Sequence, residues 1–187
     1  MTATAFVLAS ALILLTPGPT NTLLAAAGAV AGLRRAVLLP VAESLGYAIA
    51  VSGFVWLTAA VADLAWAMPA MKAAAAAWLL YAATRLWTAT VATTPEPAPR
   101  AFGRVLVTTL LNPKAMLVGT LMIPQLPPPE AAPWIGGFVA MAYLAGLGWV
   151  LFGASLPSRI RPYAYKAAAM VLGLFSLIAL GGAIATA

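Results

Sequence analysis

The stretch at residues 1–33 reads MTATAFVLASALILLTPGPTNTLLAAAGAVAGL, and it contains no charged side chain. It is longer than the roughly 20 apolar residues that a helix needs to cross the ~30 Å hydrocarbon core of a bilayer. Residues 131–158 and 167–187 are likewise free of charges. The sequence therefore predicts an all-α integral membrane protein.

The composition indicates the same class of protein. Of the 187 residues, 64% are hydrophobic and 7% are charged, whereas a soluble domain has about 45–50% apolar and about 25% charged residues. The N-terminus lacks the basic region of a signal peptide, so we expect the first apolar segment to be retained. Hydropathy and helix breakers predict a single transmembrane domain, 1–187, with six spans. They are expected near residues 4–31, 37–61, 70–92, 102–123, 134–156 and 167–186.

Two proline motifs divide the chain into similar halves. Thr16-Pro17-Gly18-Pro19 interrupts the first expected span, and Asn112-Pro113-Lys114 interrupts the fourth, about half the chain length away. Three spans per half is an odd number, so the two halves must enter the membrane in opposite directions, as in many secondary transporters. We therefore expect two inverted three-helix repeats, with broken helices 1 and 4. They would lie at about 1–92 and 102–187, joined by a linker at about 93–101.

Basic residues predict the orientation in the membrane. The odd-numbered connections and the helix ends beside them hold eight basic residues, and the opposite side holds only Lys72. Because cytoplasmic connections carry the excess of Lys and Arg, both termini are expected outside a bacterial-type cytoplasmic (inner) membrane. The eight residues are Arg34, Arg35, Arg85, Arg100, Arg104, Arg159, Arg161 and Lys166.

The two breaks form the candidate substrate site. Thr16 and Asn112 each precede a proline, and an N-cap residue followed by proline is typical of a helix start. We expect two half-helix N-termini, each with roughly +0.5 of dipole charge, to meet at mid-membrane and hold a carboxylate. An ordinary proline kink is the alternative. The predicted substrate-binding residues are Pro17, Gly18, Pro19, Asn21, Asn112, Pro113 and Lys114.

Glu43 and Lys114 are the ionisable residues farthest from a span end. A charge at membrane depth costs at least ~2.5 kcal/mol, so such residues normally face a cavity or a partner. Glu43 is the candidate for proton coupling, and Lys114 would attract the substrate carboxylate and adjust the proton affinity of Glu43. Alternatively, Glu43 reaches the interface or pairs with Arg34 or Arg35, and Lys114 extends its apolar stem toward the surface.

Several other functions are disfavoured by residue content. The chain has no Cys and no His, so we expect no disulfide, no metal site and no cofactor. With four acidic residues in total, it also lacks a convincing Ser/His dyad or carboxylate pair, so we do not expect an enzyme. The net charge of +6 comes from residues spread over short connections, which does not indicate a nucleic-acid partner.

Several motifs along nearly the whole chain form a recognisable set. They are Thr16 to Asn21, Gly32, Glu43 to Gly46, Trp78 to Tyr81, Phe102-Gly103, Leu111 to Ala115 and Pro124-Gln125. This set resembles the LysE/RhtB family of amino-acid exporters, and the resemblance implies export of a small zwitterion, driven by the proton motive force. The chain departs from the family pattern near Glu43, where members often have a small residue, and in its short central connection and C-terminus.

The leading interpretation is a secondary active transporter that exports an amino acid or a related small zwitterion. A passive small-solute channel is the alternative, because facing Asn-Pro half-helices also occur in pores. Accumulation against a gradient distinguishes the two, since only a coupled carrier achieves it. The expected partners are the small-molecule substrate and the lipid bilayer, and a homo-oligomer is compatible with this interpretation.

Overall fold

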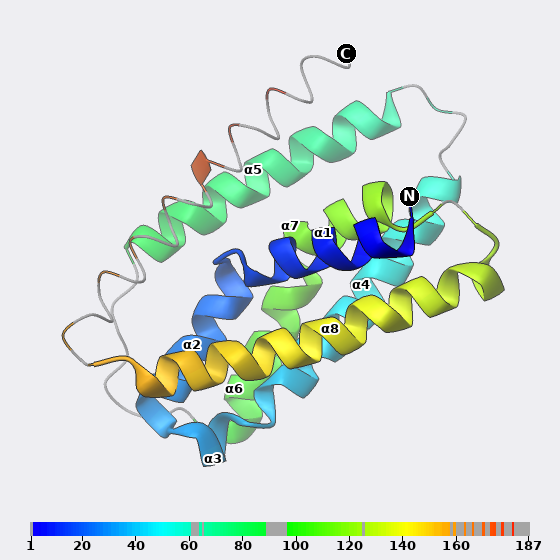
Figure 1. Ribbon diagram of the computed structural model, residues 1–187. Coiled ribbons are helices and arrows are strands. Elements are labelled where there is room, and N and C mark those ends of the chain that lie inside the picture. Colours follow the sequence, from blue (N-terminus) through cyan, green and yellow to red (C-terminus); the bar gives the residue numbers. More distant parts are fainter. Residues whose placement is uncertain are drawn as a thin grey trace.

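A computed structural model describes most of the chain as helices, and the described residues contain no strand (Figure 1). The sequence prediction of an all-α protein is confirmed for this part. Residues 2–60, 64, 66–88, 97–124, 126–157 and 159 are described, as are single positions between 163 and 181. The helices are α1 (Ala3–Leu15), α2 (Pro19–Ala31), α3 (Leu33–Ala36), α4 (Leu39–Ala60), α5 (Ala67–Trp87), α6 (Ala98–Leu110), α7 (Pro113–Leu117), the π-helix η1 (Val118–Met122) and α8 (Pro128–Ser155).

Two of these segments, Leu33–Ala60 and Pro129–Ser155, are long and apolar enough to cross a membrane. Two bent pairs reach that length together: α1 with α2, bent by 58°, and α6 with α7 and η1, bent by 41°. The described residues therefore hold two to four candidate membrane spans. Helix α5 lies at the third expected span but is less apolar, since it contains Lys72 and Arg85. The sixth expected span, 167–186, lies outside the described residues except at single positions.

The break between α1 and α2 differs from the sequence prediction. Thr16 ends α1 as its C-cap, and α2 begins two residues later than predicted, with Gly18 as N-cap and Pro19 in the first turn. The prediction that Thr16 caps a helix starting at Pro17 is therefore wrong. Gly18 is extended (φ −164°, ψ 175°), as favoured for a residue before proline, so a helix cannot begin at Pro17. The Thr16 hydroxyl donates instead to the carbonyl of Leu12, at 2.8 Å.

The break between α6 and α7 agrees with the sequence prediction. Asn112 is the N-cap of α7, and its side-chain oxygen accepts a hydrogen bond from the backbone N–H of Lys114 at 3.0 Å. Pro113 follows in the first helical turn, where its missing N–H leaves no donor unpaired. The asparagine and the proline together therefore account for a new helix start inside this bent segment.

Helices α4 and α8 pack against each other and run antiparallel (Figure 1). The ring of Tyr47 on α4 packs edge-on against Phe138 on α8, with ring centroids 5.3 Å apart. Glu43 lies one turn before Tyr47 on α4. It contacts α8 at Gly146, which lies two turns after Phe138. Residue numbers thus rise along one helix as they fall along the other, which establishes the antiparallel arrangement.

Each bent pair packs against the long helix of the other half of the sequence. Helix α2 lies along α8 so closely that a Cβ on Gly28 would overlap the backbone of Val150, and one on Gly153 would overlap Ala25. Glycine at these contacts lets the two backbones approach, as is common between helices in membranes. The first half of the chain is therefore held to the second half along a tight interface.

The other bent pair makes the corresponding contact with α4. A Cβ on Gly46 of α4 would overlap the side chain of Thr109 on α6, and one on Gly119 of η1 would overlap Phe54 and the backbone of Val51 on α4. Both interfaces join one half of the sequence to the other. This cross-packing brings the two breaks to the middle of the bundle.

Candidate functional site

The two helix breaks contact each other through Asn112. Its side-chain nitrogen donates to the hydroxyl of Thr20, at 3.0 Å, and to the hydroxyl of Tyr47, at 3.4 Å. The hydroxyl oxygens of Thr20 and Thr109 lie 3.2 Å apart. All four residues are buried. Because Thr20 lies in the first turn of α2 and Asn112 caps α7, the N-terminal ends of these two half-helices lie side by side.

Lys114 reaches from α7 to the other break. Its ammonium donates a hydrogen bond to the backbone carbonyl of Thr16, and its outer stem lies against Gly18. A Cβ on Gly18 would come within 3.1 Å of Lys114 Cε, so the missing side chain makes room for the lysine. Only 6% of Lys114 is exposed, and no carboxylate forms an ion pair with it among the described residues. Its positive charge is therefore met by the C-terminal end of α1, which carries roughly −0.5 of dipole charge.

Two further side chains bind the carbonyl end of α1. The amide nitrogen of Asn21 donates to Leu14 O at 2.8 Å and to Thr16 O at 2.9 Å, while the indole N–H of Trp149 donates to Leu14 O at 3.1 Å. The last carbonyls of a helix have no partner within that helix. Here α2, α7 and α8 each supply a donor to them, which fixes the end of α1 in the centre of the bundle.

Glu43 is buried on α4, with 1% of its surface exposed. Its carboxylate oxygen Oε2 has no hydrogen-bond partner among the described residues, and it lies where a Cβ on Gly146 would project. Arg34 and Arg35 are exposed, and neither forms an ion pair with Glu43 in the described structure. The two alternatives in which Glu43 reaches the interface or pairs locally with these arginines therefore do not describe the structure.

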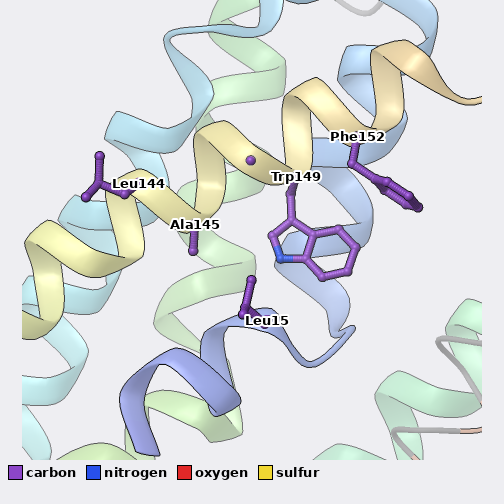
Figure 2. Close-up of a pocket in the computed structure, with 6 residues that line it drawn as sticks. Leu15, Leu144, Ala145, Trp149 and Phe152 are labelled. Atoms are coloured by element: carbon purple, nitrogen blue, oxygen red, sulfur yellow. The ribbon is translucent and has the colours of Figure 1, made fainter. Parts of the chain in front are cut away.

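A cavity of about 380 Å³ adjoins the break in the first bent pair. Figure 2 shows Trp149 of α8 reaching across it toward the end of α1 at Leu15. Apolar side chains make up most of its walls, and the indole N–H is turned to the carbonyl of Leu14. The lining residues are Leu15, Leu144, Ala145, Gly148, Trp149 and Phe152.

A second cavity, of about 250 Å³, adjoins the other break. Asn112 and Pro113 line it, together with Trp78 of α5. Each break thus has a space of small-molecule dimensions beside it, and in the second one a predicted site residue forms the wall. The other lining residues are Phe54, Ala74, Leu110, Leu111 and Met116.

The structure brings most of the predicted site residues together. Gly18, Asn21, Asn112 and Lys114 belong to one polar network, and the three prolines of the prediction, Pro17, Pro19 and Pro113, lie in the two breaks that hold it. No ion pair joins Glu43 and Lys114 among the described residues. The alternative in which Lys114 extends to the surface is not what the structure shows.

Sequence reasoning missed four members of the network, Thr20, Tyr47, Thr109 and Trp149. Tyr47 had one available signal, since it follows Glu43 by four residues and lies on the same helix face. Thr109 looks like an ordinary helical threonine, because its hydroxyl also donates to the carbonyl four residues before it, at 2.8 Å. Among the described residues, no group of three metal-ligating side chains comes together.

No known family, curated protein or solved structure matches this chain. The resemblance to LysE/RhtB exporters therefore stays a prediction from the sequence motifs. Three features of the described structure bear on function: the paired helix breaks, the buried Lys114 and the buried Glu43, whose Oε2 has no hydrogen-bond partner.

Proposed function

We propose that this protein is a secondary active transporter that exports an amino acid or a related small zwitterion across the cytoplasmic membrane. One observation carries the proposal: two helix breaks from opposite halves of the sequence meet around buried Asn112 and Lys114. Polar and ionisable groups at membrane depth are costly and commonly mark substrate or ion pathways. Transporters with discontinuous helices bind their substrates at such breaks.

A zwitterion suits the charges of this site. The Lys114 ammonium has three donors, and the carbonyl of Thr16 is the one acceptor found for it among the described residues. Two donors are therefore available for a substrate carboxylate, next to the N-terminal ends of α2 and α7. The carboxylate of Glu43 supplies the opposite charge, and its free Oε2 can accept from a substrate ammonium or take up a proton.

The proposed topology is six spans in two inverted three-helix repeats, with both termini outside the cell. The antiparallel course of α4 and α8 supports it, as does the cross-packing of each bent pair on the long helix of the other half. The proline motifs half a chain apart and the resemblance to LysE/RhtB exporters support the same arrangement. In such an architecture, the site would lie where the repeats meet.

Glu43 is the proposed proton carrier of the transport cycle. It is the buried carboxylate of the described bundle, and its Oε2 converges with Leu24 of α2 and Pro40 of α4 on the place that a Cβ on Gly146 of α8 would take. An ionised carboxylate without a partner is unfavourable in such surroundings. Binding of the substrate ammonium or of a proton would remove that penalty, so the two cations would compete for one carboxylate. That competition gives export coupled to the proton gradient.

The proposal is tested with purified protein in liposomes that contain a mixture of the common amino acids. After a pH gradient is imposed, mass spectrometry measures which amino acid moves and whether it accumulates against its own gradient. Accumulation supports a coupled carrier, whereas a solute that only equilibrates would indicate the passive channel. Protein that moves none of the amino acids, in either direction of the gradient, would refute the proposal.

A further inference from the structure

We propose that Lys114 is a tethered cation that fills a cation site at the C-terminal end of α1, so that this carrier needs no free Na⁺. The Na⁺ independence of transport rests on the proposed function, whereas the cation site itself does not. The site consists of the carbonyl of Thr16, where α1 ends, and the Lys114 ammonium that donates to it.

The end of α1 has the properties of a cation site. A helix C-terminus carries roughly −0.5 of dipole charge and carbonyls without partners in the helix. In transporters with broken helices, unwound carbonyls and half-helix C-terminal ends hold the Na⁺ or H⁺ that drives transport. Thr16 has that position here, at the C-cap of a half-helix and next to an unwound Pro-Gly segment. An ammonium from the other half of the sequence takes the place of a free ion.

The surroundings of Lys114 indicate that its ammonium occupies a preformed binding site. The ammonium is buried, its stem lies against Gly18, and a Cβ there would crowd both Cε and Nζ. Asn21 donates to the same carbonyl of Thr16 and holds it in place. Among the described residues, removing the ammonium would leave the Asn21 amide as the one side-chain donor to the carbonyl of Thr16, beside a space of the size of the lost group.

The test is rescue of Lys114→Ala by small cations. Purified protein in detergent is heated at constant ionic strength, with methylammonium chloride or NaCl replacing tetramethylammonium chloride, an ion too large for the space. We expect Lys114→Ala to have a lower Tm than the wild type in tetramethylammonium. Methylammonium or Na⁺ should then raise that Tm saturably, by roughly 5 °C or more at about 100 times Kd.

Lys166→Ala is the matched control, because it removes an exposed lysine whose ammonium lies 5.7 Å from the ring centroid of Trp87. Neither this variant nor the wild type should respond to methylammonium or Na⁺. If Lys114→Ala does not survive purification, Lys114→Met keeps the stem against Gly18 and leaves a gap for NH₄⁺ or Na⁺. A Tm that no small cation raises selectively, or an equal rise in the wild type, would overturn the tethered-cation proposal.

Transport then tests the second part of the inference. Wild-type export should be the same in Na⁺, K⁺ and choline media, and export by Lys114→Ala should require Na⁺ or methylammonium. A wild type that needs Na⁺ would refute the Na⁺ independence. The Tm measurements do not depend on the substrate, so the cation site can be shown or refuted even if no amino acid is transported.

Discussion

Replacing Asn112 with alanine removes the residue that joins the two breaks. Its side-chain oxygen caps α7 by accepting from Lys114 N–H, and its nitrogen donates to Thr20 and Tyr47. Loss of an N-cap costs ~1 kcal/mol, and hydrogen bonds between helices in membranes average ~0.6 kcal/mol each. The free energy of unfolding should therefore fall by about 2 kcal/mol, and export should fall with it because the ends of α2 and α7 are no longer joined.

Asn112→Ser separates these two contributions. The serine keeps an oxygen that can cap α7, but it has no side-chain N–H to donate to Thr20 or Tyr47. We expect it to recover the ~1 kcal/mol of the cap while export stays low. A double-mutant cycle with Thr20→Val isolates the bond between the breaks, and its coupling energy should be ~0.6 kcal/mol.

The assays are thermal unfolding of the purified protein in detergent and export from liposomes under a pH gradient. Expression should largely persist, since about 2 kcal/mol lies within the range of ordinary single substitutions. If Asn112→Ala exported as the wild type does and unfolded at the same temperature, the break would be an ordinary proline kink. Zero coupling between Asn112 and Thr20 would show that their hydrogen bond does not hold the breaks together.

Three further predictions follow from other parts of the structure. Glu43→Gln should abolish export driven by a pH gradient but retain substrate exchange. Glu130→Gln makes the same change on the surface and should retain both activities. Full pH-driven export by Glu43→Gln would refute the assignment of the proton to Glu43. Gly146→Ala should lower the free energy of unfolding by about 1–3 kcal/mol, because its methyl group would overpack against Glu43. Gly137→Ala places its methyl group in open space and should not. Equal stability of the two variants would contradict the close contact between Gly146 and Glu43. Reporter fusions at the C-terminus should be active outside the cell, and activity confined to the cytoplasm would contradict the proposed topology.

The sequence was informative where local chemistry alone determines the structure. Asn112 followed by Pro113 predicts a helix start at the observed place, because the cap and the missing N–H act within a few residues. Thr16-Pro17-Gly18-Pro19 contains two prolines, and either could occupy the first helical position. The structure uses Pro19, since Gly18 is extended before it. The existence of this break was predictable, but the residue at which the second helix begins was not.

Contacts between residues far apart in the chain could not be predicted from the sequence. Glu43 and Lys114 stood out as charges at membrane depth, yet their partners depend on how the helices pack. Lys114 binds a backbone carbonyl of Thr16, and backbone groups carry no sequence signal. Trp149 binds the same helix end from α8, which required knowing that α8 runs along α2.

Apolar packing and polar chemistry are assigned to different residues in this bundle. Gly28 and Gly153 hold α2 to α8 through close backbone contacts, and Gly46 and Gly119 let α4 approach α6 and η1 equally closely. The polar layer between the breaks adds a few hydrogen bonds, each worth ~0.6 kcal/mol in a membrane. Rearranging that layer should therefore cost only a few kcal/mol, which the binding of a millimolar-to-micromolar ligand, about 4–8 kcal/mol, can offset. The glycine interfaces can thus keep the halves assembled while the site between them opens and closes around a substrate, as the proposed export requires.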